Sequence, residues 1–396
     1  MTILQILWFF LIFVLIAGYF VLDGFDLGAG VLYPVLAKDE TERAYIRRSI
    51  VPVWDGNEVW LLTAGGALFA AFPAAYATTF SGFYLAVMLV LFGLIVRAVS
   101  LEFRAHDASW SRVWDVCFVV GSFLPALLLG VAVGNAFAGI PMAANGDYSG
   151  VPLLGLITPY TLLVGLLGFS MCLTAGCLWI ALKTPEGSDL RARARKLGGI
   201  LQIVTLVLFV VCGAMTLGVI RPAIEPAMWP VACVFAVLFA IALIVSIYLG
   251  RAKGSDLGAF LAQSAGAVCL IGLLATSMFP TLVVADPAGV GASITAATAA
   301  SSEISLAWMT GIACIGVPLG VVMAWWEPMD TRKTWRSMER KHYLKWLSVL
   351  CVVLAVFGAG IFAVGYQSLS VGRVATICLL VVAAAVLAWL SRRDRP

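Results

Sequence analysis

The feature that most limits how this chain can fold is a series of about eleven apolar runs, most of them about twenty residues long or longer. A helix needs about twenty apolar residues to cross the ~30 Å hydrocarbon layer of a membrane. No water is available in that layer, so a chain that crosses it must satisfy its backbone as a helix. Only 12% of the residues are charged, about half the share of a soluble domain. We therefore expect an all-α, polytopic integral membrane protein. The expected spans are 3–22, 53–72, 76–100, 116–139, 158–182, 198–218, 229–250, 260–283, 305–326, 345–366 and 372–391.

The basic residues test both the number of spans and their direction. If the N-terminus lies outside the cytoplasm, alternate connecting segments face inward, and those segments hold every Lys and Arg except Arg221 and Arg373. Arg97, near the end of the third span, is counted among them. Basic residues gather on the cytoplasmic side of membrane proteins. We therefore expect about eleven transmembrane helices, an outer N-terminus and a cytoplasmic C-terminus. Because the positive charges border the spans and form no single patch, we expect no nucleic-acid partner.

Five carboxylates stand out because they fall at the cytoplasmic ends of expected spans. Asp23 and Asp26 close the first span, Asp55 and Glu58 open the second, and Asp115 opens the fourth. Within each pair, the i, i+3 spacing puts both acids on one face of a helix. A carboxylate that faces hydrocarbon costs ~2.5–3.5 kcal/mol, so these acids should face protein or water. Clustered acids in a poorly solvated place can take up protons near neutral pH. The two pairs are therefore candidate proton-transfer residues.

Structural roles compete with proton transfer at both pairs. Asp55-x-x-Glu58 has the spacing of a capping box, with a short acceptor at the N-cap and an acid three residues later. Capping and proton handling are compatible there. Asp23 and Asp26 lie at a helix C-terminus in this topology, where the dipole is unfavourable, so capping does not explain them. A salt bridge to one of the arginines at 47–48 is their structural alternative.

Ligands for a metal or a haem are scarce in this chain. Its only histidines, His106 and His342, lie in basic inner segments outside the spans. Haem within a membrane bundle usually takes axial His, or His together with Met. The nine cysteines are scattered without a C-x-x-C pair, so we expect no zinc site. We therefore expect no metal centre in this chain, and any redox cofactor would belong to a partner.

Four stretches, in order, resemble subunit II of the cytochrome bd quinol oxidases. They are DGFDLGAG at 23–30, WDGNEVWLLTAGGALFAAFP at 54–73, FSGFYLAVMLVL at 80–91 and GSFLPALLLGVAVGN at 121–135. Weaker matches continue through MFP at 278–280 and SSEISL at 301–306, so the likeness covers about 1–345. We expect a family membrane domain with about nine spans over 1–345, and a C-terminal extension with two further spans over 346–396.

The resemblance implies the haem-free subunit of a bacterial terminal oxidase, which oxidises membrane quinol and reduces O2 to water in the inner membrane. In that family, subunit I is the partner and carries two b haems and one haem d. Small single-span accessory subunits accompany related oxidases. The implied fold is two four-helix bundles plus peripheral helices.

The resemblance also implies roles for single residues. Protons for O2 reduction come from the cytoplasm, and Asp55 of the WDGN motif is the implied uptake residue, with Asp26 as its neighbour. The family permits Gln at the position of Glu58, so that residue is not assumed essential. A structural quinone or lipid has room in a groove of this subunit, but no residue is assigned to it.

Two other functions remain open from the residues alone. A secondary transporter usually shows inverted repeats with polar residues at the membrane midplane, whereas the ionisable groups here lie at one face. A membrane assembly or anchoring protein would take no part in turnover. Either rival should be purified without stoichiometric haem protein, whereas an oxidase subunit should bring subunit I with it.

Overall fold

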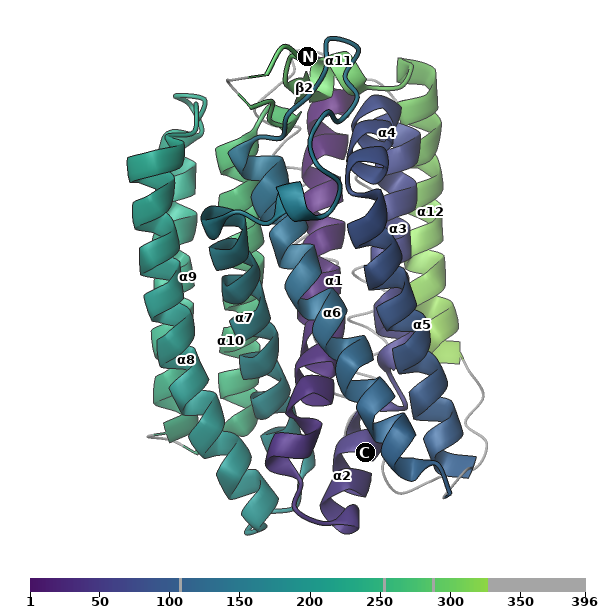
Figure 1. Ribbon diagram of the computed structural model, residues 1–396, viewed down its shortest axis with the longest axis vertical. Coiled ribbons are helices and arrows are strands. Elements are labelled where there is room, and N and C mark those ends of the chain that lie inside the picture. The colour runs from purple at the N-terminus through teal and green to yellow at the C-terminus, as the bar shows by residue number, and fades with distance from the viewer. Residues whose placement is uncertain (107–108, 252–253, 287–288, 327–396) are drawn as a thin grey trace, which may run out of the picture. The chain divides into compact units, whose positions relative to one another are not determined.

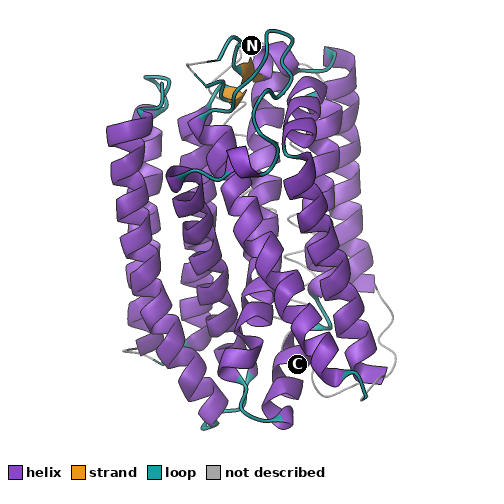
Figure 2. Ribbon diagram, viewed as in Figure 1, coloured by secondary structure: helices purple, strands orange, loops and turns teal. Residues whose placement is uncertain are grey.

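The computed structural model describes residues 1–106, 109–251, 254–286 and 289–326, and this part of the chain is almost entirely helical (Figures 1 and 2). The elements are α1 (Ile3–Leu36), α2 (Glu40–Ile50), α3 (Trp54–Ala71), α4 (Pro73–Gly82), α5 (Tyr84–His106), α6 (Ser111–Ala138), η1 (Leu154–Leu156), α7 (Pro159–Lys183), α8 (Asp189–Met215), η2 (Thr216–Ile220), α9 (Trp229–Arg251), α10 (Asp256–Met278), β1 (Thr281–Val283), β2 (Ile294–Thr295), α11 (Ala296–Ala299) and α12 (Glu303–Trp326). Two compact units divide the chain. One is Trp8–Ser301 together with Met1, and the other holds Thr2–Leu7 and everything from Ser302 onward.

Long apolar helices dominate the described ranges. Seven of them, α1 and α5 to α10, are long and apolar enough to cross a membrane. Helix α3 has 18 residues and is therefore about 27 Å long, but it carries Asp55, Asn57 and Glu58 near its start. Together with α3 and α12, the seven helices match the first nine expected spans, so the polytopic all-α fold is confirmed. The expected spans 345–366 and 372–391 lie outside the described residues.

Two expected boundaries are wrong. The first span was predicted to end at residue 22, but α1 continues without interruption to Leu36, because nothing before Pro34 in its last turns breaks an apolar, glycine-containing helix. The third span was predicted to begin at residue 76. Instead, Pro73 starts the separate short helix α4, and α5 begins only after Phe83.

The transmembrane helices of the first unit pack in two groups of four, as the family resemblance implied. Helices α1, α3, α5 and α6 form one group, and α7 to α10 form the other. Helix α1 also touches the second group closely, because a Cβ on Gly28 would lie 1.8 Å from the carbonyl oxygen of Cys172 in α7. Helices α6 and α7 meet in the same way, at Gly130 and Gly165. Glycines at these crossings let the backbones approach to a distance that no other residue allows.

The two ends of these groups differ in charge. Helix α2 and the connection between α7 and α8 lie at one end, here called the basic end, and β1, β2 and α11 lie at the other (Figures 1 and 2). Among the described basic residues, Arg221 precedes α9 at the end away from α2, and Arg97 lies inside α5. The remaining described Lys and Arg residues lie at or near the basic end. This asymmetry is the charge pattern from which a cytoplasmic position of the basic end was predicted, and the orientation stays a prediction.

Candidate functional site

Asp23 and Asp26 are buried in the middle of α1, with exposed fractions of 0% and 1%. The prediction that they close a helix at its C-terminus is wrong, since α1 runs on for ten residues beyond Asp26. The argument from an unfavourable helix dipole therefore does not apply to them. A buried carboxylate needs a charged or hydrogen-bonding partner inside the protein.

The partner of Asp23 is Arg97, which lies inside α5 with an exposed fraction of 1%. The Nη2 atom of Arg97 is 2.7 Å from Oδ1 of Asp23 and 3.6 Å from Oε2 of Glu58. The structural alternative, a salt bridge to Arg47 or Arg48, is therefore wrong for Asp23, whose ion-pair partner is Arg97. The sequence prediction counted Arg97 among the basic inner segments, together with Arg104 and Arg112. Close packing against Gly121 of α6 instead holds this turn of α5 in the interior.

The partner of Asp26 is Asn57, the asparagine of the WDGN motif. Its Nδ2 atom donates to Oδ2 of Asp26 over 2.7 Å, and both side chains are buried. This bond joins α1 to α3 one turn away from the bond between α1 and α5. Sequence reasoning missed Asn57, although its place between the two acids of WDGNE was the available signal.

These residues form one group, here called the buried acid cluster: Asp23, Asp26, Asn57, Glu58 and Arg97. Two of its three carboxyl groups, those of Asp23 and Glu58, contact the guanidinium of Arg97, and the third, that of Asp26, is bound by Asn57. Among the described residues, no hydrogen-bond partner reaches Oδ2 of Asp23, Oδ1 of Asp26, or Nε and Nη1 of Arg97. A buried polar network with unfilled bonding capacity is costly and requires an explanation. One explanation is that these side chains bind and release protons or bind a bridging water molecule.

Asp55 lies at the surface, at the start of α3. Its Oδ1 atom accepts a hydrogen bond of 2.7 Å from the backbone N–H of Gly56, and the structure gives it no ion pair with a described residue. The predicted capping box is wrong, because Val53 is the N-cap residue and caps without a side-chain hydrogen bond. Asp55 is already within the first helical turn, where the helix dipole favours a negative charge. Glu58 points to Arg97 instead of returning to the helix start.

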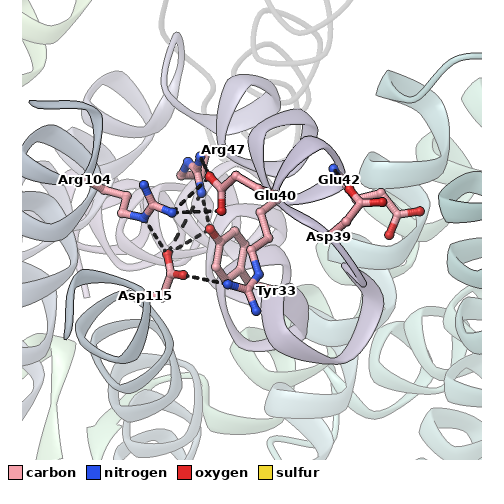
Figure 3. A network of polar contacts seen from close by, with 8 residues as sticks. Tyr33, Asp39, Glu40, Glu42, Arg47, Arg104 and Asp115 are labelled. Atoms are coloured by element: carbon pink, nitrogen blue, oxygen red, sulfur yellow. Dashed lines mark hydrogen bonds and ion pairs between the residues drawn. The ribbon is translucent and has the colours of Figure 1, made fainter. Parts of the chain in front are cut away.

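Asp115 belongs to a second set of ionic contacts at the basic end, here called the Asp115 network (Figure 3). The network joins four helices through Tyr33, Glu40, Arg43, Arg47, Arg104 and Asp115. Asp115 accepts hydrogen bonds from the hydroxyl of Tyr33 at 2.9 Å, from Nη1 of Arg43 at 3.2 Å and from Nε of Arg104 at 3.0 Å. Arg47 donates to the Tyr33 hydroxyl and, over 2.7 Å, to Glu40. Asp115 is thus near the start of α6, as expected, but it is separate from the buried acid cluster.

The arginines also set the ionisation of Glu40. Partial burial of Glu40 opposes ionisation, but the hydrogen bond from Arg47 and the charges of Arg47 and Arg104 outweigh it. The pKa of Glu40 is therefore held below its ordinary value.

Comparison with known proteins identifies the family. The family model for cytochrome bd terminal oxidase subunit II matches residues 4–328. The chain belongs to this family. The resemblance seen in the DGFD and WDGN stretches is thereby confirmed, and the match ends before the two expected C-terminal spans.

Curated relatives agree with this assignment to the subunit II family, and a solved structure shares the fold. The chain is 33% identical to cytochrome bd-I ubiquinol oxidase subunit 2 of Escherichia coli K12, over 85% of this chain and 97% of that protein. It is 33% identical to cytochrome bd ubiquinol oxidase subunit 2 of Bacillus subtilis, over 87% of this chain and 100% of that protein. A probable cytochrome oxidase subunit 2 of Haemophilus influenzae is 46% identical, over 53% of this chain and 56% of that protein. The structure of bd oxidase from Geobacillus thermodenitrificans shares the fold, with a TM-score of 0.66 and 15% identity over 82% of this chain and 99% of that one.

Within the described residues, His, Cys, Asp and Glu side chains do not form any group of three or more that could hold a metal ion. The side chain of His106 and the whole of His342 lie outside the described part. The seven described cysteines are free thiols.

A large apolar cavity lies between α1 and helices of both groups. Its volume is about 590 Å³, and Leu27, Leu61, Val164, Phe209 and Leu274 are among the residues that line it. Pockets for small molecules usually measure ~300–1,000 Å³. Its walls favour an apolar molecule or an apolar chain.

Proposed function

We propose that this chain is the haem-free subunit II of a bd-type quinol:O2 oxidoreductase in a bacterial inner membrane. It would hold the haem-bearing subunit I in place and supply a proton uptake path from the cytoplasm. Two b haems and one haem d would belong to subunit I, together with the oxidation of quinol. The E. coli and B. subtilis relatives are subunits of ubiquinol oxidases, which supports this reading.

The observation that carries the proposed path is the position of Asp55 next to the buried acid cluster. Asp55 is exposed, whereas Asn57 and Glu58, two and three residues further along α3, already contact Asp26 and Arg97. A proton taken from water by Asp55 would pass to Glu58 and then to the acids of α1. Because the cluster has three carboxyl groups and a single guanidinium, it can hold a proton without burying additional net charge.

The proposed direction of transfer would make the reaction generate a membrane potential. Protons taken from the cytoplasm would meet electrons from quinol, whose own protons leave on the outer side. The basic end would then face the cytoplasm, and the N-terminus would lie outside. No separate proton pump is needed for this charge separation.

Substitution of Asp55 by Asn tests the path. We expect Asp55→Asn to lower the rate of O2 reduction per haem about tenfold or more, because it removes one proton-binding group and changes little else. Glu102→Gln is the matched control, since Glu102 is an exposed acid of α5 near the same end. The complex is purified through this subunit, and its haem content is measured first. Normal turnover by the Asn variant would reject the path, and purification of this chain without haem protein would favour a transporter or an anchor.

The apolar cavity supports the proposal that this subunit binds a structural quinone or lipid. A long isoprenoid or acyl chain suits its walls, which are almost entirely hydrocarbon. Small accessory subunits and surrounding lipids would bind elsewhere, and no described residue is assigned to them. Organic extraction of the purified complex, followed by mass spectrometry, would identify the occupant. Extraction of neither quinone nor lipid in stoichiometric amount would reject a bound molecule.

A further inference from the structure

Helix α2 is short, but it is fixed to the first helix group by ionic contacts. Three of its residues, Glu40, Arg43 and Arg47, take part in the Asp115 network. Figure 3 shows Arg47, Glu40 and Arg104 converging around Asp115 and the hydroxyl of Tyr33. The network therefore joins α2 to α1, α5 and α6 at once.

Helix α2 is also fixed to the second helix group. Nη2 of Arg193 in α8 is 2.5 Å from Oε2 of Glu42 and donates to the backbone carbonyl of Leu36 over 2.9 Å. Nε1 of Trp179 in α7 donates to the carbonyl of Ser49 over 3.1 Å. Between these contacts, Ile46 is buried in the apolar core that both groups share. Little freedom remains for α2 to shift or rotate.

The connection from α2 to Asp55 is short and hydrogen-bonded. Helix α2 ends at Ile50, and the backbone N–H of Val53 donates to the carbonyl of Ile50 over 2.9 Å. The N–H of Asn57 then donates to the carbonyl of Val53 over 3.0 Å, within α3. A displacement at the end of α2 is therefore passed directly to the first turn of α3, which carries Asp55.

We propose that the Asp115 network positions Asp55 for proton uptake by holding α2 in place. Tyr33, Arg47 and Asp115 are positioning residues in this account and carry no protons themselves. The proposal rests on the proposed proton path. It adds that the geometry of the path's outer end is set by contacts that lie outside the buried acid cluster.

Two pairs of substitutions on and beside α2 test the proposal. Tyr33→Phe removes only the hydroxyl that links Arg47 to Asp115, and Tyr45→Phe is its control because Tyr45 is an exposed tyrosine of α2. Arg47→Gln removes the contacts to Glu40 and to Tyr33, and Arg48→Gln is its exposed neighbour in the same helix. O2 reduction per haem and the KM for quinol are measured between about pH 6 and about pH 8.5.

The expected result is a defect that depends on pH. A misplaced uptake residue slows proton delivery, so the turnover of the Tyr33 and Arg47 variants should fall about tenfold at alkaline pH, where protons are scarce. At acid pH the loss should be less than about twofold, and the KM for quinol should not change. The ionisable groups beyond Asp55 include Glu58 on α3, Tyr19, Asp23 and Asp26 on α1, and Arg97 on α5. None of them is altered in these variants.

Each outcome separates this proposal from the proposed function. If Asp55→Asn impairs turnover but Tyr33→Phe and Arg47→Gln behave like their controls, the path stands and the positioning role is wrong. A loss that is equal at every pH, in variants with full haem content, would also reject positioning. If Asp55→Asn itself turns over normally, the proton path fails first. If the complex with Arg47→Gln does not assemble, Tyr33→Phe still tests the positioning role, because it keeps the ring that packs against Phe118.

Discussion

The ion pair between Asp23 and Arg97 allows a quantitative prediction of stability. The two charged atoms are 2.7 Å apart, and the two side chains are 0% and 1% exposed. Removal of Arg97 leaves the charge of Asp23 buried and uncompensated, and removal of Asp23 leaves Arg97 only the more distant Glu58 at 3.6 Å. Loss of one partner of a buried pair typically costs ~3–5 kcal/mol. We therefore expect Asp23→Asn and Arg97→Gln each to lower the free energy of unfolding of the complex by about that amount.

The double variant is the sharper test of this pair. When both charges are absent, neither is stranded, so the combined loss should be smaller than the sum of the single losses by about 2 kcal/mol or more. Glu40→Gln serves as the control for a pair whose acid is largely exposed, and it should lower the free energy of unfolding by less than about 1 kcal/mol. Unfolding is followed in mixed detergent micelles with increasing denaturing detergent. Strict additivity of Asp23→Asn and Arg97→Gln would refute the claim that these two charges depend on each other.

Three further predictions follow from contacts elsewhere in the chain. Gly28→Ala should lower the free energy of unfolding by about 3 kcal/mol or more, because its Cβ would lie 1.8 Å from the α7 backbone. Gly24→Ala should be nearly neutral, because its Cβ would meet only side-chain atoms, of Cys172 at 3.6 Å and of Phe20 at 3.8 Å; equal melting temperatures of the two variants would contradict this. Asp256→Asn should lower the melting temperature of the complex, because this buried acid accepts from two arginines of α8; an unchanged melting temperature would argue against the pairing. Because the pKa of Glu40 is lowered on folding, its small contribution to stability is present above pH 4.5 and is lost as the pH falls below that value. Glu40→Gln should therefore make the free energy of unfolding depend less on pH in the acid range, and an unaltered pH dependence would contradict this.

The membrane fold could be predicted from the sequence because length and apolarity alone decide it. A run of about twenty apolar residues has only one way to satisfy its backbone in a membrane. The ends of the helices were harder to predict. The first span was predicted to end at residue 22, but α1 continues to Leu36, and Gly28 and Gly30 let it pack closely against α7 and α6.

The candidate site was predicted in part. The acids of α1 and α3 were identified from their spacing. In the buried acid cluster, Glu58 contacts Arg97 and Asp26 accepts a hydrogen bond from Asn57. Arg97 was counted among the basic inner segments. No local pattern distinguishes an arginine at the membrane surface from one that pairs with a buried acid. Its role depends on the crossing of α5 and α6 at Gly121, which is a tertiary contact. Tertiary contacts of this kind cannot be predicted from the local sequence.

Proton uptake by the complex itself is the most direct test of the central claim. The fully reduced complex is mixed with O2 in weakly buffered solution that contains a pH indicator, and the rate of proton uptake is compared with the rate of haem oxidation. For Asp55→Asn we predict that proton uptake slows about tenfold or more while the first oxidation of haem by O2 keeps its normal rate. Uptake that remains as fast in Asp55→Asn as in the unaltered complex would contradict the account.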